Sequence, residues 1–353
     1  MTTQGTRRIE INGRTIGRDA PPYVIAELSG NHNGSLETAL TILDAAADAG
    51  ADAVKLQTYT PDTITLPSDG PDFKITEGLW AGRTLYELYD WAHTPWDWHK
   101  ALFDRAAERG MTIFSSPFDE TAVDFLEDLN APAYKIASFE AVDLPLIRYV
   151  ATTGKPMIIS TGMADSEEIA EAIEAARSGG CDQMVVLHCV SGYPAPPSDY
   201  NLATLPDMAA QHGVLTGLSD HTLDNATAIA AVALGAVVVE KHVTLDRNSG
   251  GPDCSFSLEP AEFASLCTGI RTAWEALGRV DYGKKSSEHQ NTKFRRSLYF
   301  RQDVRKGQQI TTDMVKSVRP GYGLAPKHLD EVIGRVARQD IARFTPVTRD
   351  VLD

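Results

Sequence analysis

The feature that most constrains the fold of this chain is a repeated alternation of short apolar strands and helical segments. Residues 23–27 and 53–58 are short and rich in apolar side chains, as buried parallel strands are. Residues 36–49 between them carry apolar side chains at helical spacing. Roughly eight such units follow one another over about 255 residues, which is the repeat and the size of a (β/α)8 TIM barrel. We therefore expect an α/β fold with a TIM barrel, and a doubly wound parallel sheet is the alternative.

The same pattern predicts the remaining units. Further strands are expected at residues 112–115, 133–136, 157–160, 184–189, 214–219 and 237–243. Further helices are expected at residues 96–108, 121–129, 144–151, 166–177, 202–211, 225–234 and 260–277. Ser166 is expected to be the N-cap of its helix, because a serine hydroxyl can accept a hydrogen bond from the first turn. Residues 59–93 form a long insert with turn residues and aromatics.

The two ends of the chain depart from this repeat. Residues 9–16 alternate apolar and polar side chains around Asn12-Gly13, which predicts a β-hairpin that plugs the bottom of the barrel. Residues 281–292 are polar and lack a core pattern, so we expect a linker there. Residues 293–353 contain short strands and turns, which predicts a small β-rich domain after a barrel domain at residues 1–280.

The composition argues against several classes of partner and location. The formal net charge is −15 and the pI is about 5.0, which argues against nucleic acid and anionic membranes. Residues 1–8 carry no apolar signal segment, and the longest apolar run, residues 226–239, is too short to span a bilayer. We therefore expect a soluble cytoplasmic protein. No C-x-x-C spacing is present, so free thiols are expected at Cys181, Cys189, Cys254 and Cys267.

Two neighbouring strands are predicted to lead into histidines. Residues 217–222, Gly-Leu-Ser-Asp-His-Thr, contain His221, and residues 237–242, Val-Val-Val-Glu-Lys-His, end in His242 one helix later. In parallel α/β folds, functional side chains gather at the carboxyl ends of the strands. Two histidines on adjacent strand ends can share one metal ion. We therefore predict that His221 and His242 mark the centre of an active site.

Lysines and hydroxyl groups are predicted at other strand ends. Residues two apart share one face of a strand, so Lys55 and Gln57 can both face the barrel mouth. An unpaired buried lysine costs several kcal/mol, so Lys55 and Lys135 beside serine hydroxyls indicate a bound phosphate or carboxylate. With a metal and the carboxylate of Glu140, this set suits metal-assisted carbon–carbon chemistry on a phosphorylated substrate.

Short motifs follow one another along the whole chain. They are Ile25-Ala26-Glu27, Asn31–Gly34, Lys55–Thr58, Ser115–Phe118, Pro132–Ser138, Ser160–Met163, Gly217–Thr222, Glu240–His242 and, near the end, Arg319–Leu324. In this order they resemble the motifs of the sialic-acid synthase family, and the last resembles its antifreeze-like (SAF) domain. The resemblance covers the chain from about Tyr23 onward and implies a TIM barrel followed by an SAF domain.

The resemblance implies a condensation of phosphoenolpyruvate with an N-acylated amino sugar, giving a nine-carbon α-keto acid and phosphate. It implies that His221 and His242 hold a divalent ion of the Mn²⁺ or Mg²⁺ type, which polarises the sugar aldehyde. Glu140, beside the catalytic Lys135, would be the base that activates water. Phosphoenolpyruvate would be held by Lys55, Ser116, Lys135, Ser138, Ser160 and Ser219, and the sugar by Glu27, Gln57, Tyr193, Asp253 and Arg319. In this family the SAF domain swaps across a homodimer, so Arg319 would act on the other subunit's barrel.

Further motifs resemble one branch of the family, the pseudaminic acid synthases. They are Gly78-Leu79-Trp80, Leu85–Tyr89, Thr94–Trp96, Ala137–Glu140 and Phe256–Glu259. The acceptor would then be 2,4-diacetamido-2,4,6-trideoxy-L-altrose, and the insert at residues 59–93 would be the place for sugar specificity or a structural flap.

Three alternatives remain open at this stage. One is an N-acetylneuraminate or legionaminate synthase acting on N-acetylmannosamine or a diacetamido-trideoxy-mannose. Another is a Schiff-base aldolase that uses Lys55 or Lys135 as the imine-forming residue. The last is an inactive barrel whose antifreeze-like module serves in dimerisation or ice binding.

Overall fold

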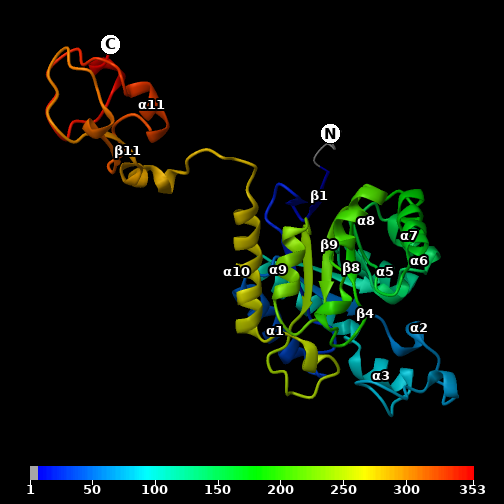
Figure 1. The fold of residues 1–353 in the computed structure, drawn as a ribbon. Coiled ribbons are helices and arrows are strands. Elements are labelled where there is room, and N and C mark those ends of the chain that lie inside the picture. The colour runs from blue at the N-terminus through cyan, green and yellow to red at the C-terminus, as the bar shows by residue number, and fades with distance from the viewer. Residues whose placement is uncertain (1–6) are drawn as a thin grey trace. The chain divides into compact units, whose positions relative to one another are not determined.

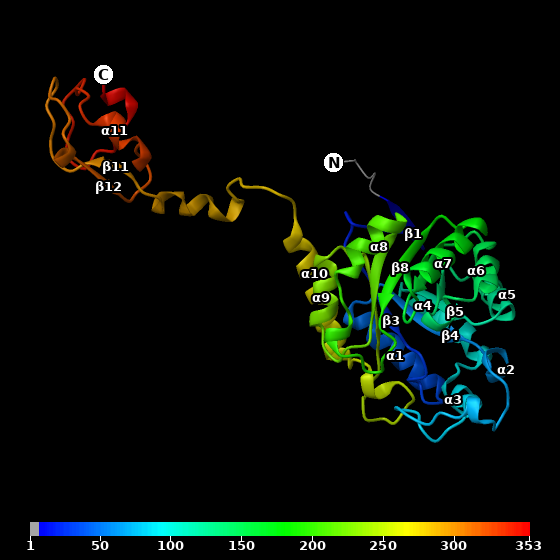
Figure 2. The ribbon, with the colours of Figure 1, turned by 45° about the vertical axis from the view of Figure 1, so that its right-hand side comes forward.

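The computed structural model describes residues 7–353, which divide into two compact units between Gly278 and Arg279. In the first unit, eight parallel strands close into a barrel, and the last strand pairs with the first. Helices surround the barrel on the outside (Figure 1, Figure 2). The prediction of a (β/α)8 barrel is confirmed, because a doubly wound sheet would have open edges.

The strands and helices of the barrel alternate along the chain as predicted. The strands are β3 (Tyr23–Glu27), β4 (Ala53–Thr58), β5 (Thr112–Pro117), β6 (Tyr134–Ile136), β7 (Met157–Ser160), β8 (Met184–Cys189), β9 (Leu215–Asp220) and β10 (Val238–His242). The helices outside them are α1 (Leu36–Ala49), α4 (His99–Glu108), α5 (Glu120–Asp128), α6 (Leu144–Ala151), α7 (Ser166–Ser178), α8 (Thr204–His212), α9 (Ala226–Ala233) and α10 (Pro260–Leu277). Across residues 7–353, no helix combines the length and the apolar character needed to cross a membrane.

Side chains along each barrel strand alternate between two buried environments. One set fills the interior of the barrel and includes Tyr23, Ile25, Ala53, Phe114, Ala133, Ile158, Leu187 and Val238. The other set packs against the helices and includes Val24, Ala26, Leu56, Ile113, Ile136, Ile159 and Val239. Because side chains repeat with a period of two, the residue two positions after an interior residue also faces the interior. At the carboxyl ends of the strands, this alternation places polar side chains in the interior, among them Glu27, Lys55, Lys135, Ser160 and Glu240.

The predicted hairpin closes the other end of the barrel. β1 (Arg8–Ile11) pairs antiparallel with β2 (Arg14–Gly17), and Asn12 and Gly13 between them have φ angles of 49° and 77°. A turn with two positive φ angles matches the right-handed twist of the strands it joins. The buried side chains of Ile9, Ile11 and Ile16 belong to the same apolar cluster as the barrel interior. The hairpin therefore plugs the amino-terminal end, and the carboxyl end is left for ligands.

The start of α7 differs from the prediction. Asp165, not Ser166, is the N-cap, and its carboxylate accepts hydrogen bonds from the backbone N–H groups of Glu167 at 2.8 Å and Glu168 at 3.0 Å. The Glu168 carboxylate accepts in turn from the N–H of Asp165 at 2.9 Å, which completes a capping box. Ser166 has Ile169 at the equivalent position, which has no side-chain acceptor to return this hydrogen bond.

The insert after β4 lies at the carboxyl end of the barrel. It contains α2 (Pro61–Ile64) and α3 (Leu85–Ala92), and a 3-10 turn at Trp96–Trp98 precedes α4, so α-helical geometry begins later than predicted. The ring of Tyr59 packs edge-on against Tyr89 of α3 and against Phe118, with centroids 5.8 and 5.0 Å apart. These aromatic contacts fasten α3 to the strand ends of β4 and β5.

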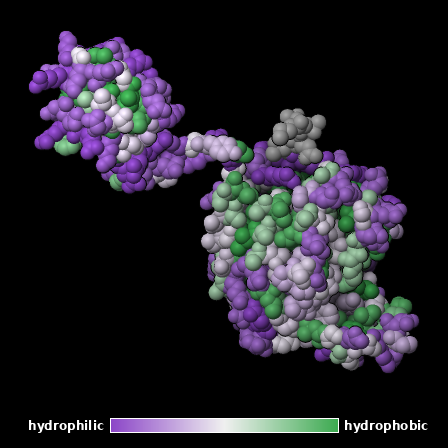
Figure 3. Space-filling view, in the orientation of Figure 1, coloured by the Kyte–Doolittle hydropathy of each residue, from purple (hydrophilic) through white to green (hydrophobic). Residues whose placement is uncertain are grey.

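The second unit has a small core of its own. β11 (Ser297–Phe300) pairs antiparallel with β12 (Val315–Val318), and a short helix, α11 (Leu329–Val332), follows. Their buried side chains include Leu298, Phe300, Ile310, Val332 and Val347. Part of the segment predicted as a linker forms a 3-10 helix at Ser286–Phe294. On the face shown in Figure 3, hydrophilic side chains cover most of this unit, whereas hydrophobic side chains gather over α9 and α10 of the barrel unit.

Gly217 of β9 occupies a position with no room for a side chain. A Cβ atom there would lie 2.5 Å from the carbonyl oxygen of Val238 and 2.6 Å from Cδ2 of Leu187. Because that carbonyl belongs to a neighbouring barrel strand, we expect Gly217→Ala to lower the free energy of unfolding by about 1–3 kcal/mol. Gly192→Ala is the matched control, because its Cβ would lie no closer than 3.4 Å to another atom. Denaturant titrations of the two variants check this, and equal losses would contradict it.

Candidate active site

Four charged side chains meet inside the barrel at the carboxyl end of its strands. Lys55 Nζ lies 2.6 Å from Glu27 Oε2 and 3.8 Å from Glu240 Oε1. Lys135 Nζ lies 4.0 Å from the same oxygen of Glu240. All four side chains are buried. Because buried charges need opposite partners, the two glutamates hold the two predicted lysines together at the centre of the barrel.

Burial and mutual attraction shift the pKa values of this cluster in different directions. Burial raises the pKa of Glu27 to about 7, although the charge of Lys55 opposes the shift. Burial lowers the pKa of Lys135, and the nearby charge of Glu240 offsets only part of this effect. Burial alone would also lower the pKa of Lys55, but Glu240 and Glu27 outweigh it and the net shift is upward. Lys55 is therefore the more firmly charged of the two amines.

The predicted serines surround the lysines. Ser116 Oγ accepts a hydrogen bond from Lys55 at 3.3 Å, and Ser219 donates to Glu240 at 3.2 Å. Ser138 Oγ accepts from the backbone N–H of Gly162 at 3.1 Å. The hydroxyl of Ser160 is buried and has no hydrogen-bond partner among residues 7–353. The structure therefore brings the four predicted serines to the strand ends that surround the lysines.

Two carboxyl oxygens near the lysines are also buried without a hydrogen-bond partner in the described part of the chain, Oε2 of Glu140 and Oε2 of Glu240. Burial raises the pKa of Glu140 to about 7, with Lys135 as an opposing influence. Native proteins leave few buried polar atoms unpaired, so each one requires an explanation. The Ser160 hydroxyl is free to donate to a bound anion, and the two carboxyl oxygens are free to accept from a donor such as water.

Gly162 allows two hydroxyl groups to approach its backbone closely. A Cβ atom on Gly162 would lie 2.1 Å from Ser191 Oγ and 2.8 Å from Ser138 Oγ. Any larger residue would displace both hydroxyls. Ser191, whose own hydroxyl is buried without a partner in the described chain, is a polar group that the strand pattern did not predict.

The predicted metal ligands face each other across adjacent strands. The ring centroids of His221 and His242 are 5.3 Å apart, and the ring planes make an angle of 59°. The Nδ1 atom of His221 lies 2.9 Å from the carbonyl oxygen of Val190, and Nδ1 of His242 lies 3.3 Å from Ser29 Oγ. These contacts orient each ring and leave both Nε2 atoms available as ligands. The arrangement fits a divalent metal held by two imidazoles.

No group of three or more histidine, cysteine, aspartate or glutamate side chains within residues 7–353 is disposed to hold a metal ion. The remaining coordination positions would therefore be taken by substrate or water oxygens, as in catalytic metal sites. Burial lowers the pKa of His242 well below its ordinary value, and the charges of His221, Lys55 and Lys135 add to this effect. The two histidines and the two lysines thus lie within electrostatic reach of one another.

The predicted sugar residues of the barrel unit lie beside the histidines. Gln57 donates a hydrogen bond to Glu27 Oε1 at 2.8 Å. The ring centroids of Tyr193 and His221 are 4.5 Å apart. Burial raises the pKa of Asp253, and hydrogen bonds from Ser29 and Gly30 and the charge of His221 oppose the shift. Arg319, the fifth predicted residue, is exposed in the other unit after β12, and its role stays a prediction.

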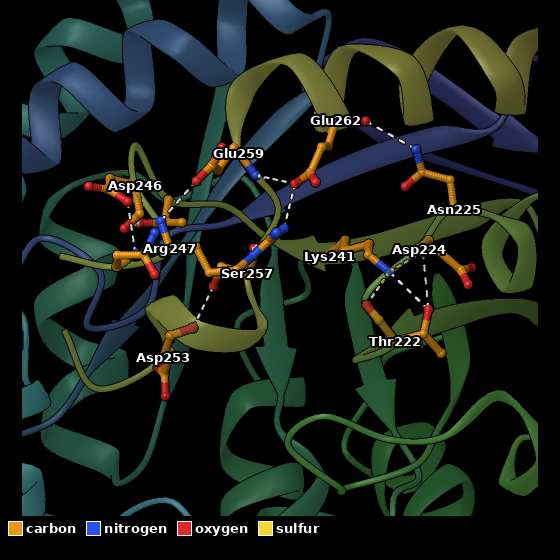
Figure 4. A network of polar contacts seen from close by, with 12 residues as sticks. Thr222, Asp224, Asn225, Lys241, Asp246, Arg247, Asp253, Ser257, Glu259 and Glu262 are labelled. Carbon is orange, nitrogen blue, oxygen red and sulfur yellow. Dashed lines mark hydrogen bonds and ion pairs between the residues drawn. The ribbon is translucent and has the colours of Figure 1, made fainter. Parts of the chain in front are cut away.

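A second buried ion pair lies on the opposite face of the histidine strands. Lys241 Nζ lies 2.6 Å from Asp220 Oδ2 and donates to the carbonyl oxygens of Thr222 and Asp224, both at 2.8 Å. Figure 4 shows Lys241 directed at Thr222 and Asp224. Asp220 immediately precedes His221, and Lys241 immediately precedes His242. The pair therefore joins the two strand ends that carry the histidines.

Sequence reasoning assigned no role to Glu240, although it stands at the centre of the site. One of its oxygens lies near both lysines and accepts from Ser219. Its spacing of two residues from His242 does predict that both side chains face the barrel mouth, but it does not predict the two lysines as partners.

Comparison with known proteins agrees with this geometry. The model of the NeuB family matches residues 42–282, and that of the SAF domain matches residues 295–352. The chain is 45% identical over 325 residues to the pseudaminic acid synthase of Campylobacter jejuni, covering 92% of this chain and 94% of that protein. It is 42% identical over 335 residues to the pseudaminic acid synthase of Helicobacter pylori, covering 94% and 98%.

A solved structure shows the same likeness. The N-acetylneuraminic acid synthetase of Leptospira borgpetersenii matches with a TM-score of 0.73 and 29% identity, over 82% of this chain and 96% of that one. The predicted family resemblance and the predicted SAF domain are thus confirmed. With a family match over more than half of its length and relatives above 40% identity, the chain belongs to the NeuB family and carries an SAF domain.

Proposed function

We propose that the chain condenses phosphoenolpyruvate with 2,4-diacetamido-2,4,6-trideoxy-L-altrose and water, giving pseudaminic acid and phosphate. The observation that carries this proposal is the convergence of Lys55, Lys135 and the unpartnered Ser160 hydroxyl close to His221 and His242. The names of the Campylobacter and Helicobacter relatives support the choice of product. Phosphate release from phosphoenolpyruvate tests it, with this acceptor compared with N-acetylmannosamine and a diacetamido-trideoxy-mannose.

The lysine cluster would bind phosphoenolpyruvate. Its phosphate and carboxylate are anions, and Lys55 and Lys135 are buried cations inside the barrel. The binding site for phosphoenolpyruvate would be completed by the hydroxyl groups of Ser116, Ser138, Ser160 and Ser219. Glu27 and Glu240 hold the lysines in place before the ligand binds, because they neutralise charges that could not otherwise stay buried.

His221 and His242 would hold a divalent ion of the Mn²⁺ or Mg²⁺ type. When bound, the ion supplies Lewis-acid polarisation of the aldehyde oxygen of the open-chain sugar. Val190 and Ser29 keep the two rings in the ligating orientation through their contacts with Nδ1. Glu27, Gln57, Tyr193 and Asp253 would line the sugar beside the ion.

Glu140 would act as the general base. A bond forms between C3 of phosphoenolpyruvate and the aldehyde carbon, and the aldehyde oxygen takes up a proton. Water adds at C2, the C2–O bond to phosphate breaks, and the C2 carbonyl forms, so that one proton of the water replaces the proton taken up and the other leaves with phosphate. Glu140 accepts the proton of that water, and its unpartnered Oε2 atom is free to do so. A carboxyl group whose pKa is about 7 is well matched to proton transfer near neutral pH.

A Schiff-base aldolase is a second candidate, because burial lowers the pKa of Lys135 and so favours a nucleophilic neutral amine. The two reactions differ in what they consume. Borohydride trapping of pyruvate on Lys135 would support the aldolase. A strict requirement for phosphoenolpyruvate, with release of phosphate, would support the condensation.

We further propose that the active protein is a homodimer in which the SAF domain of one subunit serves the barrel of the other. Arg319 would bind the acceptor's N-acetyl group. The family resemblance supports this arrangement, and the exposure of Arg319 leaves its guanidinium available for a ligand.

Removal of either histidine is expected to abolish tight metal binding. Calorimetric titration of His221→Ala and His242→Ala with Mn²⁺ should show an affinity lower by more than about 100-fold, because each variant lacks one of the two protein ligands. Circular dichroism should stay unchanged. The matched control is His289→Ala, which removes an exposed histidine of the other unit. Unchanged Mn²⁺ affinity in either ligand variant would contradict the metal site.

Glu140→Gln is expected to lower kcat by roughly 100- to 10,000-fold while phosphoenolpyruvate still binds, because the amide cannot accept a proton. In the unmodified protein the base is active only when deprotonated. The kcat/KM value should therefore rise with pH through about 7 and level off above it. The control is Glu174→Gln on the exposed side of α7. A pH profile that is flat between 6 and 8 would show that Glu140 is not the titrating base.

Mixed subunits test the role of Arg319. Arg319→Ala and Glu140→Gln subunits should each have low activity alone at a fixed, limiting sugar concentration, but dimers formed from both should recover activity. In such a dimer, an intact barrel of one subunit meets an intact arginine of the other. Sugar KM should rise in Arg319→Ala, with little change for phosphoenolpyruvate. No recovery on mixing would show that Arg319 does not act across subunits.

A further inference from the structure

Trp80 connects the insert after β4 to the sugar side of the site. Its indole Nε1 donates a hydrogen bond to the carbonyl oxygen of Pro252 at 2.8 Å, next to Asp253 in the chain. Its ring centroid lies 5.6 Å from that of Tyr193, with the planes at 53°. One side chain of the insert thus contacts two of the segments that carry predicted sugar residues, those of Tyr193 and Asp253.

Trp80 is the outer member of a row of aromatic rings that leads to the histidines. Tyr193 lies 4.5 Å from His221 and 5.1 Å from Phe256, between ring centroids. Phe256 lies 5.0 Å from His242. The row therefore begins at the two proposed metal ligands and ends at Trp80, which is half-buried.

The chemistry of Trp80 limits what it can recognise. Indole has a single hydrogen-bond donor, and that donor is already used by Pro252. The rest of the ring offers only an apolar, polarisable surface. Trp80 can therefore favour a methyl group, and it cannot satisfy a hydroxyl group placed against it.

We propose, on the basis of the proposed function, that Trp80 determines specificity for the methyl-bearing end of the acceptor. The aldehyde carbon of the sugar is held at the histidines, so the far end of its six-carbon chain extends away from them along the aromatic row. Carbon 6 of the acceptor is a methyl group, and it packs against the Trp80 ring. A 6-hydroxyl in the same place would be desolvated without a partner.

The hydrogen bond to Pro252 gives Trp80 a fixed position. Pro252 is tightly packed, since a Cβ atom on Gly30 would lie 2.5 Å from its Cγ atom. Ser257 Oγ donates to the carbonyl oxygen of Asp253 at 2.7 Å, which anchors the same loop to the start of α10 (Figure 4). The apolar surface is therefore attached to a rigid part of the barrel unit rather than to the insert alone.

The test compares two acceptors that differ only at carbon 6, the 6-deoxy sugar and its 6-hydroxy counterpart. We expect Trp80→Ala to lower the ratio of their kcat/KM values by roughly 10- to 100-fold, the range for one small group in an apolar pocket. The loss should appear in the 6-deoxy sugar, with an unchanged KM for phosphoenolpyruvate. Trp80→Phe should retain most of the preference, because it keeps an apolar ring. Trp274→Ala is the matched control, since its indole also donates to a backbone carbonyl, that of Arg18, at the opposite end of the barrel.

Two results would overturn the inference while leaving the proposed function intact. One is an unchanged ratio in Trp80→Ala. The other is an equal loss of kcat/KM for both acceptors in Trp80→Ala. Trp80→Phe would show the same equal loss if only the hydrogen bond to Pro252 were important. Failure of the proposed function has a different signature, because the unmodified protein would then release no phosphate with the 6-deoxy sugar.

Discussion

The carboxyl end of this barrel depends on one constraint, which is that the charges of two buried lysines must be neutralised by nearby carboxylates. Lys55 and Lys135 lie in the barrel interior, where an uncompensated charge would cost several kcal/mol, and Glu27 and Glu240 supply the opposite charges. Because one oxygen of Glu240 serves both lysines, the cluster is shared among β3, β4, β6 and β10. The closed barrel is what brings these four strands around one point.

The two faces of β9 and β10 perform different tasks. The inward face carries Glu240, His221 and His242, and the outward face carries the buried pair of Asp220 and Lys241. This pair contributes little to stability relative to an apolar pair of the same size. Removal of one partner would nevertheless leave the other charge buried and unpaired. Because Asp220 and Lys241 directly precede His221 and His242, the pair that fixes the register of β9 against β10 also fixes the distance between the two imidazoles.

The aromatic side chains add a third level of organisation. Tyr59 fastens α3 to the strand ends, and the row from Trp80 through Tyr193 to Phe256 borders the histidines. Charged groups and imidazoles thus form the centre of the proposed site, whereas the insert and the loop before α10 form the surface around it. This division is common in TIM barrels, where loops vary on a constant set of strands.

The sequence by itself determined the strand–helix repeat, the Asn12-Gly13 hairpin and the inward direction of Lys55, because all three follow from local periodicity. It also indicated His221 and His242, since strand ends are where such groups act. The prediction of Ser166 as the cap of α7 was wrong, because Asp165 is an equally good cap and only Asp165 has a glutamate, Glu168, placed to complete a capping box. Only the tertiary structure decided the partners that meet across the barrel. Glu240 reaches Lys55 because β10 closes onto β3, and Trp80 reaches Pro252 because the insert folds back over the strand ends. Such contacts join residues far apart in the chain, and no local pattern records them.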